Sequence, residues 1–183
     1  MRKLFALTLI LVFSLCTLGL AMAEDSPLLA GEKAVHTDFT SAIPKDRIIG
    51  VEQFKKAYDA VMAGKKKAYL IDVRTHPEFY AFHIEGTDHI HAGHMYTIPK
   101  KITDPNAEIY IWCRTSHRAK YVGGFLYKYG YKNVYVFGDG VVGWAAAGYP
   151  FVNQFTGLFK ITEYRKDPSD LEKSFRIREF HPY

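Results

Sequence analysis

The chain has 183 residues, 48% of them hydrophobic, and a formal net charge of +5. This length is enough for one domain with a sizeable core. The basic excess is too mild and too evenly spread to indicate nucleic-acid binding, but it is compatible with a small anionic substrate.

The first 23 residues form a segment of their own. Arg2 and Lys3 precede a nearly unbroken apolar run over residues 4–20, and Ala21-Met-Ala23 has the small residues of a cleavage site. This pattern predicts a secretory signal peptide over residues 1–23, with export to a bacterial periplasm. An uncleaved anchor is the alternative, because the apolar run is long. Cleavage would remove two of the 24 basic residues and none of the 19 acidic ones, which leaves a net charge of +3.

Beyond this segment, strands alternate with helices. Residues 24–45 are polar and weakly patterned and are predicted to form an extended lead-in. The pattern then predicts strands at 48–50, 68–74, 108–112 and 133–137, a strand end at 96–99, and helices at 51–63, 75–82, 118–129 and 141–147. The alternation predicts an α/β domain of three layers, with a mostly parallel central sheet flanked by helices.

Local signals support several of these boundaries. Thr75-His-Pro-Glu78 has the spacing of a capping box with a proline in the first helical turn. Gly64, Gly130 and Gly148 stand where the predicted helices end. Residues 108–112 are apolar or aromatic on both faces, as expected of a buried parallel strand.

Cys113 follows that buried strand directly and precedes a helix. Open α/β sheets bind ligands at this edge, and backbone N–H groups and the helix dipole favour an anion there. Arg114 and Arg118 add positive charge. We therefore predict a reactive thiolate that a small anion can reach from solvent.

Cysteine usage supports a functional role for this thiol. Once Cys16 leaves with the signal peptide, Cys113 is the single cysteine of the chain. Exported proteins normally use cysteines in pairs as disulfides, so a lone thiol in an oxidising compartment suggests that this thiol has a function. A cysteine that merely fills the core is the alternative.

Four motifs occur in the order and spacing of a known family. They are Leu70-Ile-Asp72-Val-Arg74, His83-Ile-Glu-Gly86-Thr leading toward Ile98-Pro99, Cys113-Arg-Thr-Ser-His-Arg118, and Val136-Phe-Gly-Asp-Gly140-Val-Val-Gly-Trp144 with Ala147-Gly-Tyr-Pro150. In these motifs residues 46–153 resemble a rhodanese-like domain of the sulfurtransferase family. The short, exported layout is similar to that of single-domain thiosulfate sulfurtransferases.

The resemblance implies a cysteine persulfide mechanism without a cofactor. Cys113 would take a sulfur atom from thiosulfate or a similar anionic donor and pass it to cyanide or a thiol acceptor. The substrate-binding loop would comprise Arg114, Thr115, Ser116, His117 and Arg118, whose backbone N–H groups could surround the anionic sulfur. In the family Asp72 and Arg74 are supporting residues, and the arginine pairs with a nearby acid, for which Glu78 is a candidate.

Loop length bears on a rival hypothesis. Cysteine-dependent phosphatases and arsenate reductases have a Cys-x5-Arg loop that accommodates a tetrahedral oxyanion, whereas Cys113 and Arg118 are separated by four residues. The shorter loop favours sulfur transfer over hydrolysis of a phosphate ester.

Two residues depart from the family pattern. Ser116 stands where many relatives have glycine, and Asp139 replaces the first glycine of a usual pair, near the lip of the expected site.

The segment 82–94 is longer than usual and holds four histidines: His83, His89, His91 and His94. A metal site is one interpretation, because alternate residues of an extended chain point to the same side. A solvated loop is the simpler one, and we predict no bound metal.

Residues 154–183 form a C-terminal extension rich in aromatic and charged residues, with a weak strand pattern from Phe159 to Tyr164 and a possible capped helix at 167–172. The extension could pack on the domain or bind a protein partner. The alternative function is therefore a persulfide carrier or sulfur-sensing module that docks a partner through this extension.

Overall fold

The computed structural model describes residues 26–161. The predicted signal segment and the predicted helix at 167–172 lie outside this range. The chain divides into two units at Thr37 and Asp38. Within the described part of the chain, no helix has the length and apolar character that a membrane crossing requires.

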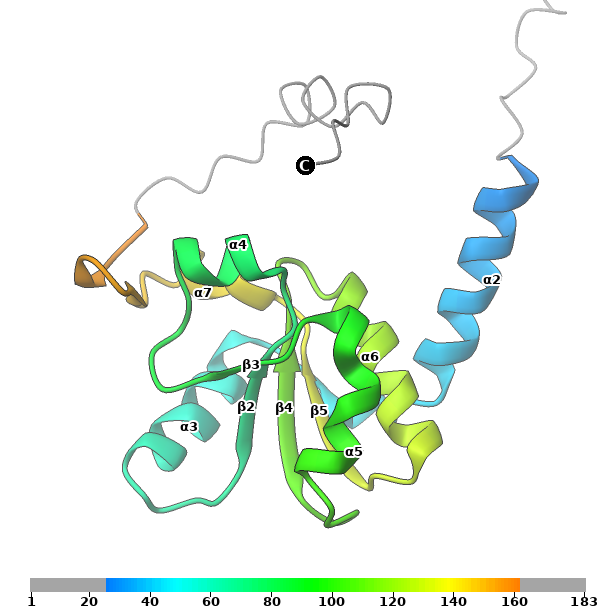
Figure 1. The fold of residues 1–183 in the computed structure, drawn as a ribbon, viewed down its shortest axis with the longest axis horizontal. Helices are drawn as coiled ribbons and strands as arrows, with labels where there is room; N and C mark the ends of the chain where they lie inside the picture. Colours follow the sequence, from blue (N-terminus) through cyan, green and yellow to red (C-terminus); the bar gives the residue numbers. More distant parts are fainter. Residues whose placement is uncertain (1–25, 162–183) are drawn as a thin grey trace, which may run out of the picture. The chain divides into compact units, whose positions relative to one another are not determined.

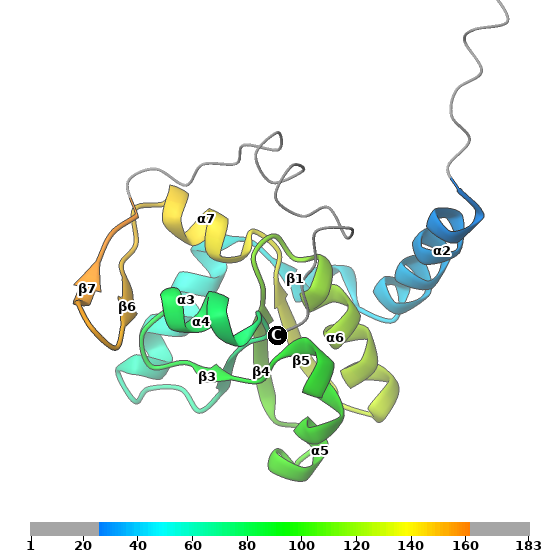
Figure 2. The same ribbon diagram turned by 45° about the horizontal axis from the view of Figure 1, so that its top comes forward.

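The second unit contains a five-stranded parallel sheet in the order β1-β5-β4-β2-β3. Its strands are β1 (Ile48–Ile49), β2 (Tyr69–Asp72), β3 (Asp88–His89), β4 (Glu108–Trp112) and β5 (Asn133–Phe137). The predicted strands at 108–112 and 133–137 have the bounds of β4 and β5. Because parallel strands share a direction, all five carboxyl ends lie at one edge of the sheet. Figures 1 and 2 show the helices α4 (His76–Ala81) and α7 (Gly140–Ala146) near that edge, beyond the tips of the strand arrows.

Helices cover both faces of the sheet. They are η1 (Lys45–Arg47), α3 (Val51–Met62), α4 (His76–Ala81), η2 (Ala92–Thr97), α5 (Ile98–Lys101), α6 (His117–Tyr129) and α7 (Gly140–Ala146). On one face, Ile109 and Ile111 of β4 share a buried cluster with Val122 of α6. On the other, Tyr110 and Trp112 share a cluster with buried residues of α3 and α7. This alternation along β4 produces the three layers that the sequence predicts.

Three sequence-based assignments were wrong. The lead-in is helical: α2 spans Pro27–Ser41 and none of its residues is buried, so no apolar stripe marks it, although alanine, leucine, glutamate and lysine favour a helix. The expected strand end at 96–99 is helical, in η2 and α5. The third is the strand expected from Phe159 to Tyr164, of which only Phe159 and residues 160–161 are described. Phe159 ends β7 (Gly157–Phe159), which pairs antiparallel with β6 (Phe151–Asn153), and residues 160–161 are in no strand.

Candidate active site

Cys113 lies in the loop that joins β4 to α6. Trp112 ends β4 and His117 begins α6, so residues 113–116 make the turn. Ser116 precedes the helix with φ 80° and is the one non-glycine residue with a positive φ in the described range. The loop thus requires a left-handed backbone at residue 116, which explains why glycine suits this position and shows that serine adopts the same conformation here.

Helix α7 fixes the other side of this loop. The backbone N–H of Val141 donates to the Cys113 carbonyl at 3.1 Å, and that of Val142 donates to the Arg114 carbonyl at 3.3 Å. Gly140 permits this approach, because a Cβ there would lie 2.4 Å from the Arg114 carbonyl oxygen. The carbonyl and N–H of a trans peptide point in opposite directions. The N–H groups of Arg114 and Thr115 therefore point away from α7.

The thiol of Cys113 is buried, with 1% of the residue exposed. The prediction of a solvent-accessible thiol is wrong for this structure. The physical reason is that Cys113 belongs to the hydrophobic cluster beneath α6, while Arg118 interacts with its side chain. A donor can reach the sulfur only if side chains over it move.

Arg118 is held by an acid from another helix. Its guanidinium donates to both carboxylate oxygens of Glu78 on α4, at 2.7 and 2.8 Å. Burial by itself would raise the pKa of Glu78, but hydrogen bonds from Arg118 and Thr75 outweigh it and lower the pKa to about 2. Hydrogen bonding to Glu78 in turn raises the pKa of Arg118, and its interaction with Cys113 adds to this. Arg118 is therefore a cation paired with Glu78 and next to the thiol.

The capping box that the sequence predicts holds Glu78 in position. The Glu78 carboxylate accepts hydrogen bonds from the backbone N–H and the hydroxyl of Thr75, at 3.0 and 2.8 Å. The backbone N–H of Glu78 donates to the Thr75 hydroxyl. This local motif aims the carboxylate at α6, forty residues away in the chain.

Asp72 and Arg74 form a second, buried pair at the end of β2. Arg74 Nη2 donates to Asp72 Oδ2 at 2.7 Å and to the carbonyl of Phe82 at 2.6 Å. Asp72 is 0% and Arg74 1% exposed. The predicted pairing of Arg74 with Glu78 is wrong, because the nearer Asp72 accepts the guanidinium. The pair connects the strand end to the segment after α4, which is a supporting role.

The remaining predicted loop residues vary in exposure. Arg114 is half-buried, whereas Thr115 and His117 are exposed. His117 packs edge-on against Tyr121, with ring centroids 5.5 Å apart. Asp139, which the sequence predicts near the lip of the site, is exposed, and its carboxylate accepts the Val51 N–H at 2.8 Å, at the start of α3.

Histidines gather at the same edge of the sheet. His76, at the start of α4, has ring centroids 4.7 Å from His89, 6.0 Å from His91 and 6.4 Å from His94. His76 was not predicted to belong with these histidines, although its position shortly after β2 in the chain implies that it lies at this edge of the sheet. Across residues 26–161, no three or more His, Cys, Asp or Glu side chains are arranged to hold a metal ion.

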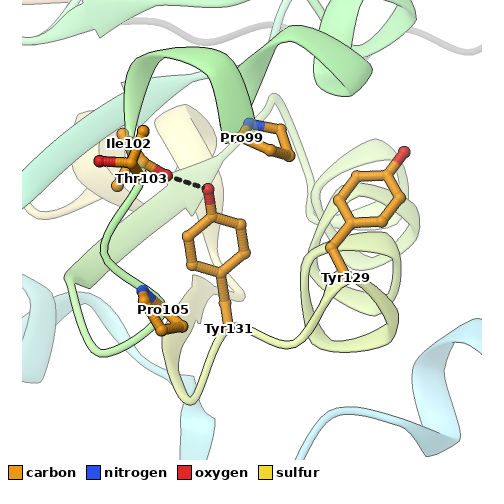
Figure 3. Close-up of a pocket in the computed structure, with 6 residues that line it drawn as sticks. All are labelled: Pro99, Ile102, Thr103, Pro105, Tyr129 and Tyr131. Atoms are coloured by element: carbon orange, nitrogen blue, oxygen red, sulfur yellow. Dashed lines mark hydrogen bonds between the residues drawn. The ribbon is translucent and has the colours of Figure 1, made fainter.

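A pocket of about 120 Å³ lies at the opposite edge of the sheet. It is lined by Pro99, Ile102, Thr103, Pro105, Tyr129 and Tyr131, and the Tyr131 hydroxyl donates to the Ile102 carbonyl (Figure 3). Since these residues either precede β4 or lie at or just after the end of α6, the length of β4 separates the pocket from Cys113.

Comparison with known proteins identifies the fold. The family model of the Rhodanese-like domain matches residues 53–147, whereas no curated protein matches the chain. A polysulfide-sulfur transferase homodimer from Wolinella succinogenes superimposes with a TM-score of 0.53 and 23% identity, over 69% of this chain and 90% of that one.

Two further solved structures have the same fold. A thiosulfate sulfurtransferase from Pseudomonas aeruginosa superimposes with a TM-score of 0.52 and 17% identity, over 70% of this chain and 25% of that one. A protein of unknown function from Rhodopseudomonas palustris, described as a possible tyrosine phosphatase, gives a TM-score of 0.54 and 18% identity, over 66% and 92%. With the family model covering residues 53–147 and the sheet and loop arranged as described, the chain belongs to the rhodanese-like domain family.

Proposed function

We propose that this protein is a sulfurtransferase that forms a persulfide on Cys113. The thiolate attacks the outer sulfur of thiosulfate or a similar donor, the sulfur–sulfur bond of the donor breaks, and sulfite leaves with the electron pair. The outer sulfur of the persulfide then bonds to cyanide or a thiol acceptor, and the Cys113 thiolate is the leaving group. The observation that carries this proposal is the position of Cys113 at the carboxyl edge of the sheet beside the paired Arg118.

The loop geometry supports transfer of a single sulfur atom. Four residues separate Cys113 from Arg118, and the N–H groups of Val141 and Val142 in α7 donate to the carbonyls of Cys113 and Arg114. The N–H groups of Arg114 and Thr115 are thereby turned away from α7, and loop N–H groups of this kind bind anions. A persulfide anion is stabilised by such donors without the space that a tetrahedral phosphate would need.

The burial of Cys113 sets a condition on this mechanism. Arg118 interacts with the thiol, and its side chain is 33% exposed. Movement of Arg118 about its Glu78 pair would open a path to the sulfur while positive charge stays near the incoming anion. We thus propose that Arg118 both admits the sulfur donor to Cys113 and helps to bind it.

The same burial favours a second candidate function. A carrier that keeps its persulfide away from solvent would release sulfur only to a docked partner, and residues 154–183 could supply the docking surface. Most of that extension lies outside the described residues. Persulfide formation without turnover of small acceptors, together with partner capture that depends on the extension, would favour this candidate.

We also propose that the protein is exported, on the basis of the pattern in residues 1–23. Fractionation of cells that produce the full chain would place it in the periplasm, with the first 23 residues removed. Recovery of the uncleaved chain in the membrane fraction would contradict this and favour the anchor.

The direct test of the transferase function is steady-state production of thiocyanate from thiosulfate and cyanide. We expect turnover by the wild-type chain and none by Cys113→Ser. An aryl phosphate, assayed in parallel, serves as the control for the phosphatase alternative. Phosphate release that depends on Cys113, without thiocyanate production, would overturn the proposal.

A further inference from the structure

Four imidazole rings form a cluster beside the active loop, and the proposed mechanism does not use them. The cluster comprises His76 of α4, His89 of β3, and His91 and His94 from the segment that follows β3. His91 and His94 have ring centroids 5.8 Å apart, and His76 lies within 6.4 Å of each of the other three. We call these four residues the imidazole cluster.

Backbone pairing places this cluster at the carboxyl edge of the sheet. Ile90 N–H donates to the Asp72 carbonyl at 3.1 Å, and Ala92 N–H donates to the Val73 carbonyl at 3.0 Å, so His91 lies between two residues that bond to the end of β2. Val73 N–H in turn donates to the Trp112 carbonyl, one residue before Cys113. With neighbouring strands about 5 Å apart, the backbone at His91 lies roughly 10 Å across the edge from that at Cys113.

One ring of the cluster has a structural role. His89 Nε2 is 2.8 Å from the carbonyl of Arg74, and because a carbonyl only accepts, this nitrogen carries the hydrogen. The His89 ring also stacks on Phe79, with centroids 4.4 Å apart. His89 therefore supports the other three rings, of which His76 and His94 are exposed and His91 is half-buried.

The electrostatics of the cluster suit an anion. Burial lowers the pKa of His91, and so do the neighbouring His94, His76, His89 and Arg118. The groups that lower the pKa of His91, which come from α4, β3, η2 and α6, are cationic when charged, and the nearby acid of α4, Glu78, is paired with Arg118. A dianion bound among these rings would relieve their mutual repulsion and favour their protonated forms.

We infer that His76, His91 and His94 form a binding site for a divalent sulfur oxyanion such as thiosulfate at the entrance to the Cys113 loop. This inference rests on the proposed function, because it names the route by which the donor approaches. Arg118 is already engaged by Glu78, so imidazolium N–H groups supply the additional positive donors. Donor binding is then coupled to proton uptake and strengthens as the pH falls below neutrality.

Calorimetry of the full chain carrying Cys113→Ser tests this inference, because this variant lacks the nucleophile and cannot react with thiosulfate. Titrations at about pH 6.5 in two buffers of different ionisation enthalpy give the number of protons taken up. We expect net proton uptake on binding, and competition by sulfate. His91→Asn with His94→Asn should weaken binding about tenfold and remove most of the uptake.

His83→Asn is the matched control. His83 is also half-buried, and its ring stacks on Phe79, with Nδ1 3.0 Å from the Phe79 carbonyl. This substitution should leave the affinity and the proton uptake unchanged. If the double variant does not fold, histidine ring proton resonances of the Cys113→Ser chain provide a second measurement, in which thiosulfate should raise the pKa of at least two cluster histidines.

The outcomes separate this inference from the proposed function. If the wild-type chain forms a persulfide while thiosulfate binds without proton uptake and with the same affinity in the double variant, the imidazole site is wrong and the transferase stands. If no persulfide forms but thiosulfate still binds with proton uptake that the double variant abolishes, the site stands and the transferase is wrong. Equal loss of affinity in His83→Asn would also contradict the inference.

Discussion

The two arginine–carboxylate pairs of the site differ in their surroundings. Arg74 and Asp72 are two residues apart, at the end of β2, and their side chains are 1% and 0% exposed. Arg118 and Glu78 are forty residues apart and join α6 to α4, with side chains 33% and 32% exposed. Both pairs lie at the carboxyl edge of the sheet, but only the second is in contact with solvent and with Cys113.

The difference indicates a division of roles. A buried pair must remain intact, because an unpaired buried charge is costly. A half-exposed pair can open at small cost, because water solvates the separated charges. The Asp72–Arg74 pair therefore maintains the strand end, and under the proposed function the Arg118–Glu78 pair moves to admit a donor. The predictions below test this contrast.

The largest effect is expected from breaking the buried pair. Asp72→Ala should lower the free energy of unfolding by about 3–5 kcal/mol, because it leaves the Arg74 guanidinium buried without its partner. Urea denaturation measures this loss. Replacing both members, with Asp72→Leu and Arg74→Met, should recover part of the stability. A loss below about 1 kcal/mol in the single variant would mean that the pair is not buried in solution.

Changing the half-exposed pair should affect catalysis more than stability. Arg118→Lys keeps the charge but cannot donate to both oxygens of Glu78, so the donor is held less well beside Cys113. We expect a decrease of about 100-fold in the rate of persulfide formation and a loss of stability of about 1 kcal/mol or less. Stopped-flow kinetics with thiosulfate and urea denaturation separate the two effects. An unchanged rate would remove Arg118 from the mechanism.

A loss of stability smaller than that of Asp72→Ala is expected at Gly140, where α7 contacts the loop. Gly140→Ala places a methyl group against the Arg114 and Cys113 carbonyl oxygens at a residue with φ 57°, and should cost about 2–3 kcal/mol. Gly148→Ala is the control, because Gly148 has φ 73° with nothing near its Cβ position, and should cost only about 1 kcal/mol. Thermal unfolding of both variants gives the comparison. Equal losses would show that the contact with α7 is unimportant.

The smallest effect concerns pH. The folded-state pKa of Glu78 is about 2, below its ordinary value of 4.5, so its carboxylate stabilises the fold above pH 4.5 and loses this contribution as the pH falls toward 2. Wild type should exceed Glu78→Gln in stability near neutral pH, by about 1 kcal/mol or less because water screens the pair. The difference should shrink in urea titrations at successively lower pH. A difference that grows on acidification would contradict the assignment of the pair.

Local sequence signals predicted much of this architecture. The apolar runs of β4 and β5 and the capping box at Thr75 gave correct elements, because each depends on residues close together in the chain. Cys113 was correctly placed at the strand–helix junction for the same reason. The strand β3 was missed because it has two polar residues, Asp88 and His89, and exists only through pairing with β2.

The long-range features of the site could not be predicted from sequence patterns. The Glu78–Arg118 pair and the packing of α7 on the Cys113 loop bring together residues that no local periodicity relates. The burial of Cys113 follows from this packing. The predicted position of Cys113 at the strand–helix junction was therefore right, whereas its predicted exposure to solvent was wrong. The position of His76 in the cluster was not predicted either, because the histidines that it contacts come from a later segment of the chain.

The central claim is that Cys113, although buried at rest, accepts sulfur from an anionic donor. Mass spectrometry of the intact chain after treatment with thiosulfate and removal of excess reagent tests it most directly. We predict that the wild-type chain gains the mass of one sulfur atom, that peptide mapping places it on Cys113, and that a thiol reductant removes it. A chain that keeps its original mass while its thiol still reacts after unfolding would contradict the account.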